Sequence, residues 1–244
     1  MYLIREKSYD SDTPIYMRLP NISNSMFIPE ARVAKDYFNT GFYERGYVDW
    51  AVENFVSNDK DVIDIGAHIG WYTVALAKKA NHVFSFECSP KSFNYLCANI
   101  ALNALDYKVT KFNSALSNEK GETPYYIRDP NDGGGNGISK FECDNLKNTP
   151  HINVPKNTLD SYNLSNIGFI KIDVEGHEKE VLEGSIETLK RNNYPNILFE
   201  SWDEHQEKNN VPSIKLRQEL FDFIESLGYK IIKVGQDMYL AEKI

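Results

Sequence analysis

The strongest indication of the fold is the stretch Asp61-Val62-Ile63-Asp64-Ile65-Gly66-Ala67-His68-Ile69-Gly70. Its first half has strand character, and a helix-forming run over 71–79 follows it at once. Glycines at 66 and 70 predict a turn between the two elements, where a backbone without Cβ can approach a ligand closely. The helix that begins there points its free N–H groups at the bound molecule. The stretch therefore predicts a ligand-binding turn at the end of a strand.

The glycine spacing decides between two classes of ligand. Gly66 and Gly70 form Gly-x-x-x-Gly, not the Gly-x-Gly-x-x-Gly of a dinucleotide site. A carboxylate at the strand's end suits a ligand with an amino group and would repel a pyrophosphate. We therefore expect S-adenosylmethionine rather than NAD as the cofactor. The contributors expected from this turn are Asp64, Gly66, Ala67, His68 and Gly70.

The composition fits a globular domain. A chain of 244 residues can hold one α/β domain with a full core and a short extension. A formal charge of −8 argues against binding of nucleic acid, which depends on Lys and Arg at phosphates. Three cysteines without paired or metal-ligand spacing suit a reducing compartment. We see no export signal and no apolar run near the ~20 residues of a membrane span, so a cytoplasmic protein is expected. The oligomeric state stays open.

Strands and helices alternate along most of the chain. Strands are expected over 61–65, 82–87, 107–112, 168–172 and 196–200, and helices over 71–79, 91–103, 177–191 and 213–227. This alternation implies a mainly parallel sheet with helices on both faces. The end of the chain, over 229–241, predicts an antiparallel hairpin. The fold class is therefore α/β, with the seven-stranded Rossmann-like sheet and C-terminal hairpin of class I methyltransferases.

The flanking and middle segments are less regular. We expect residues 1–40 to form an N-terminal arm or small extension and residues 41–244 to form the methyltransferase domain. Between about 117 and 157 the alternation breaks, apart from strand-like runs over 124–127 and 152–154. The Gly133–Gly137 tract is interpreted as a plain loop rather than an active-site lid. We expect that loop and residues 1–40 to shape the acceptor pocket.

The second strand ends at Glu87, about 20 residues after the glycine turn, where an acidic side chain accepts hydrogen bonds from both ribose hydroxyls of a nucleotide. The alternative is a surface glutamate after an edge strand. By topology the loop after the third strand lies over the adenine, which makes Ser114 and Ala115 candidate contacts to its edge. A strand-end Asn113 in the same loop is commonly only a turn residue.

Four motifs resemble those of the FkbM-type methyltransferases. They are Asp64-Ile65-Gly66-Ala67-His68-Ile69-Gly70, Phe86-Glu87-Cys88-Ser89-Pro90, Thr158-Leu159-Asp160 and Ile170-Lys171-Ile172-Asp173-Val174-Glu175-Gly176-His177-Glu178, in the family's order. The resemblance covers about residues 40–205 and implies an S-adenosylmethionine-dependent O-methyltransferase, with acceptors such as sugars, glycans and macrolide hydroxyls. It places Cys88 in the cofactor loop, where the family more often has proline.

Carboxylates are expected at the catalytic end of the sheet. The fourth strand delivers Asp173 and Glu175, and the fifth delivers Glu200, to the edge where open α/β sheets bind ligands. A sugar hydroxyl is a poor nucleophile at neutral pH, so it needs a base or a metal to take up its proton. One of these carboxylates or His177 is the candidate base, and Asp173 is also a candidate cofactor contact. His205 lies nearby in sequence.

Two alternatives stay open for these carboxylates. Their oxygens suit Mg²⁺ or Mn²⁺, with Asp173 and Glu200 as the metal ligands. Otherwise Asp173 only orients the cofactor and Glu175 caps the next helix. The predicted activity is methyl transfer to a hydroxyl of a small acceptor, in the first place a sugar of a glycan or glycoconjugate. The rival functions are transfer to a polyketide, lipid or peptide hydroxyl, or a non-catalytic cofactor-binding module. The sequence does not identify the acceptor or the hydroxyl.

Overall fold

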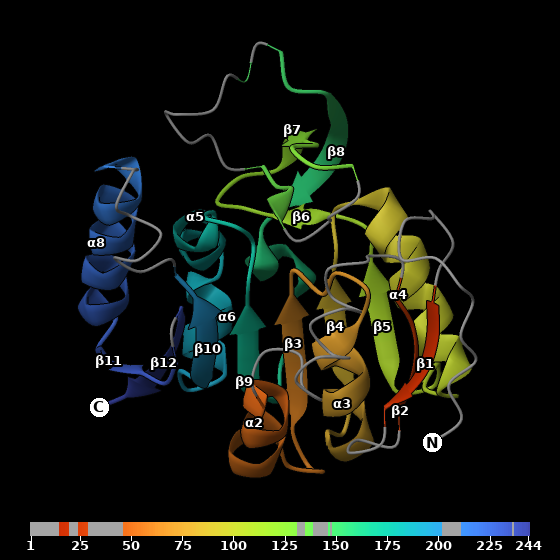
Figure 1. Ribbon diagram of the computed structural model, residues 1–244. Coiled ribbons are helices and arrows are strands. Elements are labelled where there is room, and N and C mark those ends of the chain that lie inside the picture. The colour runs from red at the N-terminus through yellow and green to blue at the C-terminus, as the bar shows by residue number, and fades with distance from the viewer. Residues whose placement is uncertain are drawn as a thin grey trace.

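A seven-stranded sheet forms the centre of the computed structural model (Figure 1). The residues that the structure describes are 15–19, 24–28, 46–130, 135–138, 146, 148–201, 211–235 and 237–244. The strand order is β11-β12-β10-β9-β3-β4-β5. The strands are β3 (Asp61–Ile65), β4 (Val83–Phe86), β5 (Val109–Phe112), β9 (Ile167–Ile172), β10 (Asn196–Glu200), β11 (Tyr229–Lys233) and β12 (Met238–Lys243).

The neighbouring strands β5, β4, β3, β9 and β10 are parallel, and β12 pairs antiparallel with both β10 and β11. The predicted fold class and its closing hairpin are therefore confirmed. The chain leaves β3 toward β4 and β5 and then returns to β9 on the other side of β3. This reversal of direction places a topological switch point between β3 and β9, the position where open α/β sheets bind ligands.

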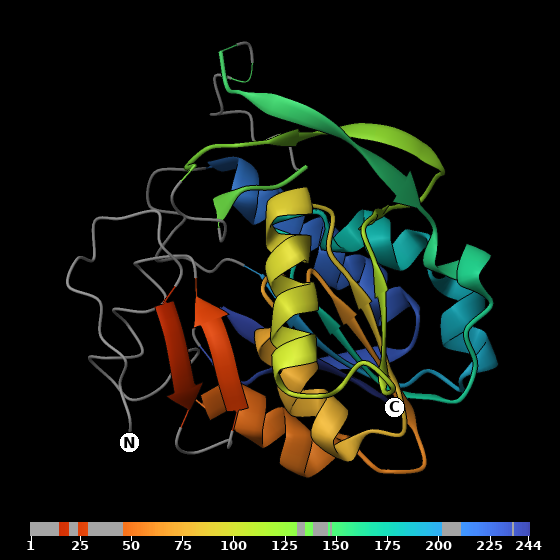
Figure 2. The same cartoon turned by 90° about the vertical axis from the view of Figure 1, so that its right-hand side faces the viewer.

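Helices cover both faces of this sheet, as predicted (Figure 2). One face carries α2 (Tyr47–Phe55), α3 (Trp71–Lys79) and α4 (Pro90–Leu102), and the other carries α5 (Glu178–Glu183), α6 (Ile186–Arg191) and α8 (Val211–Ser226). Side chains alternate between the faces along each strand. On β3, Val62 packs toward the first group of helices and Ile63 toward the second. Asp64 therefore shares the face that α3 covers.

The prediction of one continuous helix over 177–191 is wrong, because this segment forms two short helices, α5 and α6. The backbone of Gly184 accepts a hydrogen bond from the N–H of Asp160 instead of continuing the helix. The carboxylate of Asp160 then accepts the N–H groups of Glu187 and Thr188, at 3.1 and 2.6 Å. A side chain from outside the helix thus caps a new N-terminus, which helical periodicity alone does not reveal.

A small three-stranded sheet lies across the carboxyl ends of the parallel strands in both views (Figures 1 and 2). We call it the roof sheet. It consists of β6 (Ala115–Leu116), β7 (Gly121–Tyr126) and β8 (His151–Asn157). Tyr126 also pairs with Gly137, which brings the described loop residues 135–138 under this roof. Gly133 and Gly134, the first glycines of the predicted loop, lie outside the described residues.

The N-terminal arm contains a two-stranded hairpin, β1 (Ile15–Leu19) and β2 (Asn24–Ile28), beside α4 (Figure 2). Met26 is buried in the core on that face of the main sheet. The rest of residues 1–40 lies outside the described part of the chain. Within the described residues, no helix combines the length and the apolar character needed to cross a bilayer.

Candidate active site

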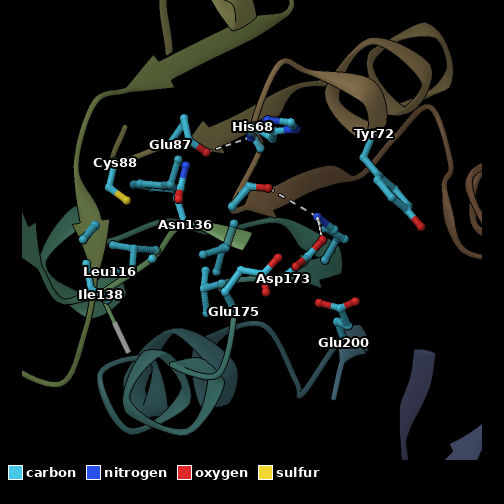
Figure 3. A pocket seen from close by; sticks show the side chains of 18 of the residues that line it. His68, Tyr72, Glu87, Cys88, Leu116, Asn136, Ile138, Asp173, Glu175 and Glu200 are labelled. Atoms are coloured by element: carbon cyan, nitrogen blue, oxygen red, sulfur yellow. Dashed lines mark hydrogen bonds and ion pairs between the residues drawn. The ribbon is translucent and has the colours of Figure 1, made fainter. Parts of the chain in front are cut away.

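A cavity of about 310 Å³ lies at the switch point, under the roof sheet. Its walls come from the ends of β3, β4, β9 and β10 and from the loop under the roof, as Figure 3 shows. Ligand pockets of small molecules begin at about this size. The predicted site residues that line it are Gly66, Ala67, His68, Glu87, Cys88, Ser114, Ala115, Asp173, Glu175 and Glu200. The structure therefore brings most of the predicted site residues together in one cavity.

The glycine turn brings β3 and β9 close together at the floor of the cavity. Gly66 has a φ of +75°, a left-handed conformation that residues with a Cβ rarely adopt. A Cβ added there would overlap the backbone carbonyl oxygen of Asp173. The N–H groups of Gly66 and Ala67 both donate to the carbonyl of Phe86, each at 2.9 Å. Only glycine fits at position 66, because the turn runs directly against the next strand.

Glu87 stands at one end of the cavity with a fixed orientation. Its Oε2 accepts the backbone N–H of His68 at 2.8 Å, and its Oε1 accepts that of Ser89 at 2.7 Å. Burial raises the pKa of this carboxyl, while His68 and the two backbone hydrogen bonds act in the opposite direction. The amide of Asn113 donates to the carbonyls of Glu87 and Cys88 and so fixes this loop. Each carboxylate oxygen keeps further acceptor capacity, as the predicted ribose contact requires.

Apolar groups adjoin Glu87. Leu116 and Ile138 lie beside Cys88 on the same side of the cavity (Figure 3). Burial and the neighbouring Glu87 raise the pKa of the Cys88 thiol well above its usual value, so this sulfur stays uncharged. The hydroxyl of Ser114 donates to backbone carbonyls of the protein, at Ala115 and Pro155. This end of the cavity thus combines apolar groups at Leu116 and Ile138 with the polar side chains of Glu87 and Asn136.

Asp173, Glu175 and Glu200 face one another at the opposite end (Figure 3), and we call them the acidic centre. Ligand oxygens of all three lie within 4.8 Å of one another. Burial raises the pKa of Glu200 well above its ordinary range, and the negative charges of Asp173 and Glu175 raise it further. Burial acts the same way on Asp173, but Lys171 and a hydrogen bond from Glu200 outweigh it and lower its pKa. Asp173 therefore ionises more readily than Glu200.

Lys171 is a functional candidate that the sequence interpretation missed. Only 2% of this residue is exposed. Its Nζ lies 3.1 Å from Oδ2 of Asp173, 3.3 Å from the carbonyl oxygen of Gly66, and 4.8 Å from the centre of the Tyr72 ring. A lysine between Ile170 and Ile172 in a buried strand was the available signal, since lysine is almost never buried without a partner. Lys171 joins the glycine turn to the acidic centre.

The prediction that Asp64 meets the cofactor's amino group is wrong in position. The side chain is fully buried beneath the turn, and its Oδ2 accepts the hydroxyl hydrogen of Thr73 at 2.5 Å. The alternation of side chains along β3 directs Asp64 toward α3 rather than into the cavity. Its Oδ1 lies 4.0 Å from Nζ of Lys171. Any influence of Asp64 on a ligand must therefore pass through its neighbours.

Two further placements differ from the prediction. Gly70 serves as the N-cap of α3 and packs toward Leu96 of α4, so it does not line the cavity. The ring of His177 also lies outside the cavity, with Nε2 3.1 Å from the Ser117 hydroxyl and Nδ1 3.6 Å from Glu180. Burial lowers the pKa of this imidazole. His177 as the base therefore stays a prediction, and its ring does not line the cavity that holds the acidic centre. His205 lies outside the described residues.

Comparison with known proteins places this site in context. The family model of the Methyltransferase FkbM domain matches residues 64–231. The chain is 29% identical to the hexuronic acid methyltransferase AglP of Haloferax volcanii over 139 residues, which are 57% of this chain and 55% of that protein. It is 44% identical over 55 residues to the tRNA(Phe) (4-demethylwyosine(37)-C(7)) aminocarboxypropyltransferase of Methanocaldococcus jannaschii, covering 21% of this chain and 22% of that one. The chain thus spans about half, or less, of these relatives.

Solved structures agree in fold. A methyltransferase FkbM from Methylobacillus flagellatus KT has a TM-score of 0.50 at 14% identity, covering 84% of this chain and 46% of that one. A putative rRNA methylase from Clostridium thermocellum has a TM-score of 0.51 at 12% identity, covering 81% of this chain and 93% of that one. Such distant likeness shows the fold alone. The exclusion of nucleic acid, expected from net charge, therefore stays a prediction.

Proposed function

Because the chain belongs to the FkbM methyltransferase family, we propose that it is an S-adenosylmethionine-dependent O-methyltransferase acting on a hydroxyl of a sugar in a glycan or glycoconjugate. The observation that carries this proposal is the difference between the two ends of the cavity. An oriented Glu87 lies at one end, the acidic centre lies at the other, and the glycine turn runs between them. The two ends match a nucleoside and a reacting hydroxyl.

The Glu87 end is the proposed cofactor half. Bound there, S-adenosylmethionine supplies a methyl group on a positively charged sulfur. Glu87 would accept hydrogen bonds from the ribose hydroxyls, as an acidic residue at the end of the second strand does in related folds. The apolar walls at Cys88, Leu116 and Ile138 would enclose the adenine. Gly66 lets the backbone pass close to the remaining part of the molecule.

The acidic centre is the proposed chemical half. As the acceptor oxygen forms its bond to the methyl carbon, its proton must leave, and an ionised carboxylate within reach can take it. We assign this role to Asp173, because Lys171 and Glu200 hold it ionised and fixed in orientation. Alignment of the reacting groups supplies much of the rate in such a displacement. Glu175 and Glu200 would hold the neighbouring hydroxyls.

A sugar acceptor is supported by two features. AglP, whose name describes a hexuronic acid methyltransferase, is similar over more than half of this chain. Aromatic side chains of Tyr47, Trp71 and Tyr72 line the same cavity as the carboxylates, so that a polyhydroxylated ring would meet both hydrogen-bond acceptors and apolar faces. The alternatives are a hydroxyl of a lipid, peptide or polyketide, or a non-catalytic cofactor-binding module.

A divalent cation is the alternative way to activate the hydroxyl. Three carboxylates with oxygens within 4.8 Å of one another are the ligand type that Mg²⁺ and Mn²⁺ take. Such an ion would contact Glu200 and would share Asp173 with Lys171. The two mechanisms differ in their response to a chelator.

The proposal is tested by methyl transfer from labelled S-adenosylmethionine to a panel of methyl glycosides, nucleotide sugars and an unmodified tRNA, with and without EDTA. Label in a sugar that survives EDTA is the expected result. Loss with EDTA and recovery with Mg²⁺ or Mn²⁺ would make the acidic centre a metal site. Label in the tRNA alone, or in no sugar at all, would contradict the proposed acceptor class.

Replacing Glu87 with alanine should weaken cofactor binding. Hydrogen bonds to charged groups contribute about 1.5–3 kcal/mol, so we expect roughly 10- to 100-fold weaker binding of S-adenosylhomocysteine. Isothermal calorimetry measures the affinity, and the thermal shift on adding the ligand provides a second readout. Glu122→Ala, which removes an exposed carboxylate from β7, serves as the control. Equal affinities of the folded Glu87→Ala and control proteins would refute the ribose contact.

A further inference from the structure

Glu178 is a buried carboxylate that the proposed reaction does not use. It lies in the first turn of α5 and is 5% exposed. Its Oε1 accepts the backbone N–H groups of Val174 and Gly176, both at 3.1 Å. These two amides flank Glu175, which lies in the loop between β9 and α5. One buried oxygen thus holds the backbone on both sides of Glu175.

The loop that carries Glu175 is in an unusual conformation. Glu175 has a φ of +57° and Gly176 has one of +90°, so two successive residues are left-handed. For a residue with a Cβ this conformation costs roughly 1–2 kcal/mol, and it persists only where the surroundings impose it. Gly137 of the loop under the roof sheet lies directly against Glu175, since a Cβ there would come 3.3 Å from Cβ of Glu175.

We propose that Glu178 is a positioning residue that holds Glu175 in the acidic centre by fixing the left-handed loop from behind. This inference rests on the proposed function for its catalytic consequence. Without the Glu178 oxygen, two part-buried N–H groups would lose a hydrogen bond that fixes the loop, which is unfavourable enough to let the loop relax. Glu175 would then move away from Asp173 and Glu200. The cofactor end would not change, because Glu87 is fixed by its own hydrogen bonds.

Two substitutions separate the hydrogen bonds from the charge. Glu178→Gln keeps a carbonyl oxygen that can accept both N–H groups, whereas Glu178→Leu has a similar volume and no acceptor. We expect Glu178→Leu to lower kcat about 100-fold, the loss typical of a slight misplacement of reacting groups, with cofactor affinity within twofold of the parent. Glu178→Gln should retain most of the activity. Glu180→Leu, on the same helix and partly exposed, is the matched control.

A double-mutant cycle shows whether Glu178 acts through Glu175. If it does, Glu178→Leu should lower kcat no further in a Glu175→Ala background, because the group being positioned is already absent. If the fold reductions in kcat of the two single variants multiplied in the double variant, this would indicate a general structural defect and would overturn the proposal. The cycle is measured with whichever hydroxyl acceptor the protein methylates, at saturating S-adenosylmethionine.

Amide hydrogen exchange, followed by NMR, tests the contact without any substrate. The amides of Val174 and Gly176 should be protected in the parent and in Glu178→Gln, and should lose protection in Glu178→Leu while the amides of β9 keep theirs. Unchanged protection in Glu178→Leu would overturn the positioning role even in an active enzyme. If no acceptor is methylated, the proposed function fails, and the exchange data still decide whether Glu178 holds the loop.

Discussion

Gly66→Ala is expected to destroy the glycine turn and with it the folded core around β3 and β9. The φ of +75° at Gly66 would cost an alanine about 1–2 kcal/mol. The larger effect is steric, because the new Cβ would overlap the carbonyl oxygen of Asp173 in the neighbouring strand. Neither backbone can move without breaking the hydrogen bonds of the sheet. Denaturant unfolding should show little or no cooperative native state, and S-adenosylhomocysteine should not bind.

Gly46→Ala is the control for the conformational part of this effect. Gly46 has a φ of +82° and nothing within 4 Å of an added Cβ. The Gly46→Ala protein should therefore be destabilised only by the cost of the left-handed conformation. A Gly66→Ala protein as stable as Gly46→Ala, with normal ligand binding, would show that β3 and β9 do not approach each other as described.

Lys171→Met is expected to have the second largest effect, on both stability and turnover. Removing the ammonium leaves the carboxylates of Asp64 and Asp173 without their cation, at 4.0 and 3.1 Å. Loss of one partner of a buried ion pair typically costs about 3–5 kcal/mol. Turnover should also fall, because the proposed base would no longer be held ionised and in place.

The stability loss in Lys171→Met should depend on pH. In the parent, Lys171 opposes the effect of burial on the pKa values of both Asp64 and Asp173. Without it, the pKa of Asp64, which burial already raises in the parent, should rise further, and the lowered pKa of Asp173 should rise as well. A carboxyl with a raised folded-state pKa destabilises increasingly as the pH rises past its unfolded value near 4. The free energy of unfolding should therefore differ from the parent's more at pH 8 than at pH 4.

Lys190→Met provides the matched control for this prediction. Lys190 is half-exposed and pairs with Glu187 at 2.9 Å on the surface of α6. Exposed ion pairs contribute about 0–1 kcal/mol, so this variant should remain close to the parent at both pH values. A Lys171→Met protein that behaves like Lys190→Met across the pH range would contradict the buried cluster of Lys171, Asp64 and Asp173.

The fold was predictable because its signals are local. The strand at 61–65 and the helix at 71–79 match the structure residue for residue, since an apolar run and a glycine turn determine both. The break between α5 and α6 was not predictable in this way. It depends on Asp160, which is distant in sequence and caps α6 from another loop. The roof sheet was only partly foreseen, because its strands pair across a long interval.

The candidate site was predictable to the level of the strand end but not of the side chain's direction. Residues at the ends of β3, β4, β9 and β10 were correctly gathered into one cavity. Asp64 and His177 belong to segments that reach the site, but their side chains bind Thr73 and Ser117 and do not line the cavity. Lys171 and Glu178 were missed because their partners are backbone groups or buried carboxylates that only the assembled fold brings near.

A crystal structure of the protein with S-adenosylhomocysteine would locate the cofactor relative to the acidic centre. We predict that the ribose hydroxyls bind the carboxylate of Glu87 and that the adenine lies between Cys88, Leu116 and Ile138. The sulfur should face the acidic centre, which leaves space for an acceptor hydroxyl beside Asp173. A ligand bound elsewhere, or bound with its sulfur directed away from Asp173, would contradict the proposed site of methyl transfer.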